Sequence, residues 1–186
     1  MALFGIFGNK DKKNNEKVKV DNDYLSAKEL YDQNKYSEAF KIVLECAKKG
    51  HPEAQNLCGD MYRVGNGVEK DLLEGVYWYE KAAEQGCIAA QYSLGLLIYR
   101  GFSPIEKNQE VGLNWLCKAA NQGHEKAIKF LRKKSEDIFF IGYDYYQKED
   151  YANALQWFLV SAEYELPNAF AICAIMHMKG QGVEKN

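Results

Sequence analysis

Residues 54–65, AQNLCGDMYRVG, decide the fold because the chain repeats their pattern at residues 90–101, AQYSLGLLIYRG. The central glycines, Gly59 and Gly95, lie 95 − 59 = 36 residues apart. The pattern returns from Ala169 to Gly180, with Ala174 in place of the glycine. A repeat period of this length is typical of arrays of small helical units. We call each of these segments a helix A.

A second pattern follows helix A, and we call it helix B. It reads DLLEGVYWYEKAAEQG at residues 71–86 and NQEVGLNWLCKAANQG at residues 108–123, and weaker copies lie at residues 35–50 and 150–162. Apolar residues recur at i, i+3, i+4 and i+7, which is the stripe of an amphipathic helix. The two patterns therefore predict an all-α chain of paired helices, in which small residues such as Gly59 and Gly75 let the two helices of a pair approach closely.

Capping residues stand where helix B is expected to begin and end. Side chains suited to cap its start are Asp71, Asn108 and Asp150, and Glu74 is placed to complete a capping box with Asp71. Glycines able to adopt the left-handed conformation after its end are Gly50, Gly86 and Gly123. Pro52 and Pro167 occupy matched positions in the first turn of helix A, where proline is tolerated.

The segment from Pro52 to Gly86 resembles a Sel-1-like repeat, and residues 87–123 resemble a more divergent copy, with Phe-Ser-Pro-Ile at 102–105 in the connecting loop. Residues 24–50 and 138–165 have a shorter turn and resemble tetratricopeptide repeats. The resemblance implies a right-handed α-solenoid of antiparallel Sel-1-like and tetratricopeptide-like helix pairs. It also implies that helix A lines the concave surface.

The organisation expected along the chain has three parts. Residues 1–20, rich in lysine and asparagine without apolar periodicity, are expected to form a disordered leader. Residues 21–134 are expected to hold a tetratricopeptide-like pair, two Sel-1-like pairs and an extra helix at 124–134, and residues 135–186 a further tetratricopeptide-like pair and a terminal Sel-1-like helix of the same solenoid. A joint is expected near residue 135. Residues 180–186, GQGVEKN, parallel 65–71, GNGVEKD, so the last helix A lacks its helix B and either belongs to a longer array or packs alone.

Composition and charge exclude several classes of function. The net charge of −2 and the absence of a basic patch in the sequence argue against a nucleic-acid partner. Five cysteines without a CxxC pair argue against a disulfide framework and a zinc site, and they favour a reducing, cytoplasmic location. The apolar run at residues 2–7 is too short for stable membrane insertion. We expect the cysteines to be small, mostly buried apolar residues.

The three histidines do not predict a metal or cofactor site. His51 and His124 occupy the same turn position before helix A, where Sel-1-like repeats often have histidine, and His177 replaces a tyrosine of helix A. None of them has a second ligand four residues further on. We therefore expect no cofactor and no metal.

The functional hypothesis is an interaction module, an adaptor or scaffold that binds a protein or peptide segment on the concave helix-A face, because tyrosine and arginine often anchor interfaces. The residues expected to bind the partner are Tyr24, Lys28, Asn56, Asp60, Arg63, Tyr92, Leu96, Arg100, Phe139 and Tyr143. The resemblance leaves two alternatives: an immunity or secretion-accessory protein that neutralises a cognate bacterial toxin, and a hydrolase. The chain shows neither a Ser-x-x-Lys pair nor a nucleophile with a placed base, so we expect no enzyme. The oligomeric state and the identity of the partner stay open.

Overall fold

The computed structural model describes residues 4–183, and the side chains of residues 14–183. Within that range the regular elements are helices, so the prediction of the all-α solenoid class is confirmed. The chain divides into two compact units, Met1–Ala119 and Ala120–Asn186. We describe each unit by itself.

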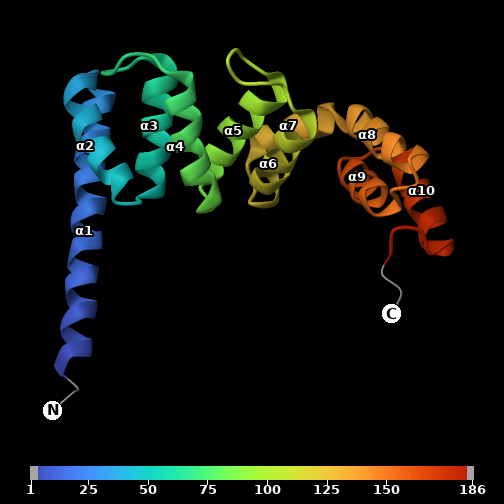
Figure 1. The fold of residues 1–186 in the computed structure, drawn as a ribbon, viewed down its shortest axis with the longest axis horizontal. Coiled ribbons are helices and arrows are strands. Elements are labelled where there is room, and N and C mark those ends of the chain that lie inside the picture. The colour runs from blue at the N-terminus through green and yellow to red at the C-terminus, as the bar shows by residue number, and fades with distance from the viewer. Residues whose placement is uncertain (1–3, 184–186) are drawn as a thin grey trace. The chain divides into compact units, whose positions relative to one another are not determined.

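Unit 1 alternates helix A and helix B (Figure 1). Its helices are α1 (Phe4–Asp32), α2 (Tyr36–Lys48), α3 (Pro52–Val64), α4 (Leu72–Glu84), α5 (Ile88–Arg100) and α6 (Gln109–Asn121), the last of which crosses the boundary at Ala119. Helices α1, α3 and α5 are of the A type, and each packs against the B helix that follows it. The predicted pairing of the two repeated patterns is confirmed.

Unit 2 contains α7 (Glu125–Lys133), α8 (Ser135–Gln147), α9 (Tyr151–Glu163) and α10 (Pro167–Met178). The extra helix expected at residues 124–134 is α7. The division into the two units falls between Ala119 and Ala120, whereas the sequence predicts a joint near residue 135. Helix α7 packs on α8, so it belongs to unit 2.

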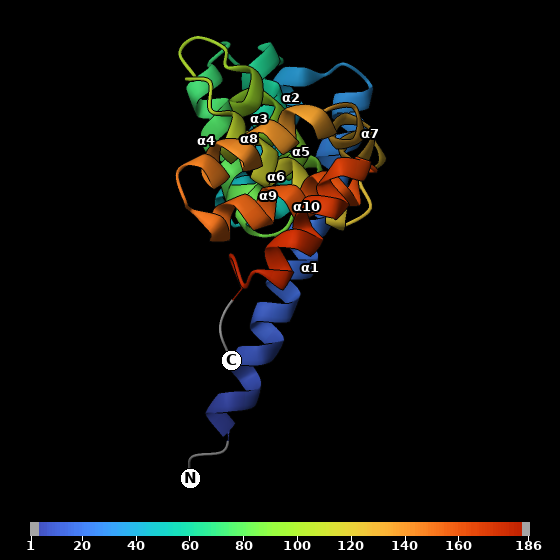
Figure 2. The ribbon, with the colours of Figure 1, turned by 90° about the vertical axis from the view of Figure 1, so that its right-hand side faces the viewer.

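The expectation of a disordered leader at residues 1–20 is corrected for residues 4–20, which are helical, while residues 1–3 lie outside the described part of the chain. Helix α1 continues past the other helices of its unit in both ribbon views (Figures 1 and 2). Asn, Lys and Glu do not interrupt a helix as proline does, so helix can continue upstream from the packed part of α1. Among the residues whose side chains are described, Val20 is the first that is buried, and it belongs to the core of unit 1.

The predicted caps of helix B are confirmed. Asp71 accepts hydrogen bonds from the backbone N–H groups of Leu73 and Glu74 at 2.9 and 3.1 Å. The equivalent bonds join Asn108 to Val111 N at 3.0 Å and Asp150 to Asn153 N at 3.3 Å. The three glycines after helix B have φ between 85° and 88°. The capping box is wrong, because the N–H of Asp71 donates to the carbonyl of Tyr62 at 2.9 Å instead of to Glu74.

Neighbouring pairs in unit 1 are joined by two buried glutamines in equivalent positions. Gln55 on α3 donates to the carbonyl of Ala47 on α2 at 3.0 Å, and Gln91 on α5 donates to the carbonyl of Ala83 on α4 at 3.2 Å. Each bond adds a second donor to a carbonyl in the last turn of helix B that already accepts the backbone N–H of Gly50 or Gly86. The same interaction therefore sets the position of each helix A on the helix B before it.

Candidate protein-binding face

The structure places eight of the ten residues expected to bind a partner on the three A helices of unit 1, and we call this surface the helix-A face. They are Tyr24 and Lys28 on α1, Asn56, Asp60 and Arg63 on α3, and Tyr92, Leu96 and Arg100 on α5. Asp21 and Tyr24 of α1 both contact His51 at the start of α3, so α1 and α3 are neighbours. Phe139 and Tyr143 lie on α8, in unit 2.

At the middle of the helix-A face, Arg63 is fixed by two hydrogen bonds. Its Nε donates to the hydroxyl of Tyr79 at 3.0 Å, and its Nη2 donates to Asp60 Oδ1 at 3.1 Å. The Tyr79 hydroxyl donates to the same Asp60 oxygen at 2.6 Å, so the three side chains form a closed network. Tyr79 belongs to α4 and is fully buried, yet the Arg63 side chain is 43% exposed. A buried tyrosine of helix B thus holds an exposed guanidinium on helix A.

Tyr24 lies at the α1 side of the face, where its ring packs on the imidazole of His51 with the ring centroids 4.6 Å apart. Burial, and after it the negative charge of Glu53, raises the pKa of Tyr24 to about 12. The hydroxyl of Tyr24 is therefore neutral near pH 7 and can donate a hydrogen bond.

The remaining predicted residues of unit 1 differ in exposure. Lys28 and Arg100 are exposed, whereas Tyr92 and Leu96 are half-buried. The Oδ1 atom of Asn56 is buried and has no hydrogen-bond partner among the residues whose side chains are described. An unsatisfied buried acceptor costs about 1–3 kcal/mol, so this part of the face favours an additional donor.

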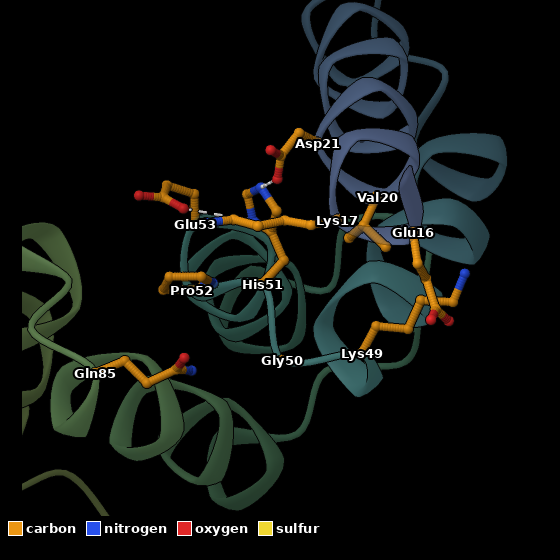
Figure 3. Close-up of a pocket in the computed structure, with 10 residues that line it drawn as sticks. All are labelled: Glu16, Lys17, Val20, Asp21, Lys49, Gly50, His51, Pro52, Glu53 and Gln85. Atoms are coloured by element: carbon orange, nitrogen blue, oxygen red, sulfur yellow. Dashed lines mark ion pairs between the residues drawn. The ribbon is translucent and has the colours of Figure 1, made fainter. Parts of the chain in front are cut away.

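A cavity of about 730 Å³ adjoins the face between α1 and the turn from α2 to α3 (Figure 3). His51 lies in its wall between two carboxylates: Nε2 is 3.3 Å from Asp21 Oδ1, and Nδ1 is 3.4 Å from Glu53 Oε2. The lining also carries Lys17 and Lys49, so its charges are mixed. The imidazole of His51 contacts the ring of Tyr24 and also lines the cavity. The cavity is therefore an extension of the helix-A face.

The structural interpretation of His51 and His124 agrees with the geometry. His51 Nδ1 accepts the backbone N–H of Ala54 at 3.1 Å, and His124 Nδ1 accepts that of Ala127 at 3.2 Å. Both residues therefore cap the start of an A-type helix. Among the described residues no group of three or more His, Cys, Asp or Glu side chains is arranged to hold a metal ion.

The two predicted residues of unit 2 have different surroundings. The ring of Phe139 packs against that of Phe158 with centroids 5.1 Å apart and is half-buried against the core of unit 2. Tyr143 is 44% exposed. Packing within unit 2 thus explains the aromatic side chain at Phe139, whereas the side chain of Tyr143 is exposed at the surface.

Tyr79 and Glu53 contact residues of the site but are not among those predicted from the sequence. Tyr79 occupies an apolar position of helix B, and its periodicity correctly indicates a core residue. The position of its hydroxyl depends on how α4 crosses α3, which no local pattern encodes. For Glu53 the available signal was its place directly after Pro52, at the start of helix A next to the turn that carries His51.

The repeated hairpins, the buried small residues and the caps together define a protein built from Sel1 repeats. The family model described as Sel1 repeat matches residues 52–87, 88–124, 137–163 and 169–186, so the chain belongs to this family. The match includes residues 137–163, for which the sequence analysis expected a tetratricopeptide-like pair. Sel1 repeats are generally non-catalytic modules that mediate protein–protein interaction.

Individual relatives share the repeats over part of their length. An uncharacterized protein of Neisseria meningitidis is 36% identical over 84% of this chain and 31% of its own length. Chitin synthase regulatory factor 3 of Schizosaccharomyces pombe is 28% identical over 50% of this chain and 10% of its own. The chain thus spans a third or less of the length of these two relatives.

A crystal structure of a Sel1 repeat protein from Oxalobacter formigenes matches 88% of this chain and 62% of its own, with 33% identity and a TM-score of 0.58. This likeness supports the fold derived above. Among the described residues no helix combines the length and apolar character needed to cross a bilayer.

Proposed function

We propose that this chain is an interaction module that binds a segment of a partner protein on the helix-A face of unit 1. The observation that carries the proposal is the exposed guanidinium of Arg63, held in place by Tyr79 and Asp60. A side chain that is already ordered loses little conformational entropy on binding. Arginine is also among the residue types that most often dominate interface energetics.

The chemistry of the face favours a partner segment rich in hydrogen-bond acceptors. Arg63 uses two N–H groups within the chain, and a guanidinium has five donors. Lys28 on α1 and Arg100 on α5 are exposed, so each A helix of unit 1 carries an exposed cation. Carboxylates and backbone carbonyls of an extended or helical segment are suitable ligands for these donors.

Affinity capture with the full chain tests the proposal. Immobilised protein is incubated with a lysate of the source organism, and retained proteins are quantified by mass spectrometry. We expect the double variant Tyr92→Ala with Arg63→Ala to lose the specific partner. The matched control is Tyr77→Ala with Lys81→Ala, which removes an exposed tyrosine and a nearby lysine from α4. Retention of the partner by the first variant would contradict the proposal.

Because Arg63→Ala also removes a bond to buried Tyr79, a second pair of variants separates binding from folding. Lys28→Glu with Arg100→Glu reverses two exposed charges of the face, and Lys41→Glu with Lys70→Glu reverses two exposed charges elsewhere in unit 1. We expect the first pair alone to weaken capture, with unchanged circular dichroism for both.

A further inference from the structure

The cavity between α1 and the turn from α2 to α3 has more negative than positive groups in its lining (Figure 3). The described lining holds three carboxylates, Glu16, Asp21 and Glu53, and two ammonium groups, Lys17 and Lys49. Within the part of the chain whose side chains are described, neither lysine makes an ion pair. The carboxylates are therefore not paired with the lysines that share the cavity.

The ends of two B helices add to the negative potential of the cavity. Lys49 follows the last residue of α2 and Gln85 follows the last residue of α4, so the C-terminus of each helix adjoins the lining. A helix C-terminus carries a negative partial charge. The start of α3 has the opposite sign, but Pro52 lacks an N–H group and the N–H of Ala54 donates to His51. The surroundings thus favour a cation.

The contact between His51 and Glu53 places two hydrogen-bond acceptors next to each other. His51 Nδ1 accepts the N–H of Ala54 at 3.1 Å, so the neutral imidazole carries its hydrogen on Nε2, which faces Asp21. Glu53 Oε2 lies 3.4 Å from the same Nδ1 and accepts no hydrogen bond from a described side chain. A charged donor that binds Glu53 relieves this contact and leaves the cap of α3 intact.

We propose that the cavity binds a primary ammonium group on an alkyl chain, which donates to Glu53. The charges of Asp21 and Glu16 attract it to the same cavity. The volume of about 730 Å³ is in the range of small-molecule sites, so the alkyl chain fits as well. This chemistry has two sources. One is a lysine of the partner segment on the helix-A face, which rests on the proposed function, and the other is a free polyamine.

An NMR titration of the isotopically labelled full chain tests the cavity. The probe is Nα-acetyl-lysine methylamide, and the matched probe is Nα-acetyl-norleucine methylamide, which lacks the ammonium group. Binding is followed by the shifts of the backbone amide signals of Gly50 and Glu53. We expect saturable shifts with the lysine probe and none with the norleucine probe, because the latter cannot donate to Glu53.

Variants of the chain assign the binding to Glu53. Glu53→Gln is expected to weaken binding of the lysine probe about threefold or more, as neutralising one partner of a partly exposed ion pair does. Glu29→Gln, at an exposed position of α1 outside the lining, is expected to leave the affinity unchanged. Lys17→Gln is expected to tighten binding, because its ammonium group competes for the same carboxylates. The Tyr92→Ala/Arg63→Ala variant is expected to bind the probe normally.

Two further measurements distinguish the sources of the ammonium group. Spermidine is titrated in the same way, and partner capture is repeated with Glu53→Gln. Weaker capture assigns the cavity to a lysine of the partner segment. Unchanged capture assigns it to a free polyamine, and spermidine must then bind more tightly than the lysine probe.

Four results would overturn the proposal. They are the absence of saturable shifts with the lysine probe, equal shifts with the norleucine probe, equal affinity of Glu53→Gln and wild type, and unchanged capture combined with weaker binding of spermidine. Failure of the wild-type chain to capture any partner contradicts the proposed function alone, because the titration needs no partner protein.

Discussion

Gly59 and Gly75 lie against each other where α3 crosses α4: a Cβ added to Gly75 would be 3.1 Å from the carbonyl oxygen of Gly59, and one added to Gly59 would be 3.0 Å from that of Gly75. The second Cβ would also be 2.8 Å from the ring of Tyr79, which is fully buried. The two helices can approach this closely only because both positions lack a side chain.

Gly59→Ala is therefore expected to destabilise the chain by about 1–3 kcal/mol, the usual cost of overpacking a core. Urea unfolding followed by circular dichroism measures the loss. The control is Ala174→Gly at the equivalent, exposed position of α10, which is expected to cost no more than about 1 kcal/mol through helix propensity. A Gly59→Ala variant as stable as the wild type would show that α3 and α4 can separate without cost.

Tyr79→Phe removes a single oxygen from the network that holds Arg63. The expected loss of stability is about 0.5–1.5 kcal/mol, because Asp60 and Arg63 are partly exposed and can turn to water. We also expect weaker capture of the partner, since Arg63 is no longer held in place. Denaturant unfolding and affinity capture measure the two effects, and Tyr77→Phe on the exposed side of α4 is the control. Unchanged capture would mean that the order of Arg63 does not contribute to binding.

The stability of unit 2 is expected to decrease as the pH falls below about 6.5, the ordinary pKa of histidine. Burial, and after it the charge of Lys126, lowers the pKa of His124. The unfolded chain therefore takes up a proton at a higher pH than the folded chain does, and folding becomes less favourable as the pH falls through the folded-state pKa. Unfolding at pH 7.5 and pH 5 in wild type and His124→Asn measures this contribution. Asparagine can cap α7 but does not titrate, so an equal pH dependence in both proteins would exclude His124 as its source.

Cys58 is expected to resist alkylation in the folded chain. Burial raises the pKa of its thiol to about 12, so the reactive thiolate does not form near neutral pH. The side chain is also fully buried, so the reagent cannot reach it. Iodoacetamide at pH 8, followed by peptide mass mapping, is expected to modify Cys58 only after urea is added. Half-buried Cys87 provides the internal comparison. Modification of Cys58 as fast as Cys87 in the native chain would contradict this packing.

The sequence by itself determined the helix pairs, because each depends on local spacing. The 36-residue recurrence of Gly59 at Gly95 is a property of the sequence itself. The caps at Asp71 and Asn108 and the left-handed glycines after α2, α4 and α6 are set by interactions within a few residues. In unit 1 the predicted helix-A residues lie on α1, α3 and α5, the three A helices of that unit.

Only the tertiary structure decided which of those side chains are fixed by hydrogen bonds and which helix surfaces are left uncovered by a neighbouring helix. The bond from Tyr79 to Asp60 joins two helices across a turn, so it depends on a crossing distance that sequence periodicity does not contain. The exposure of Phe170 and Met178 is likewise a property of what packs nearby. Local sequence specifies which side of a helix is apolar, but only the arrangement of the neighbouring helices determines whether that side is covered.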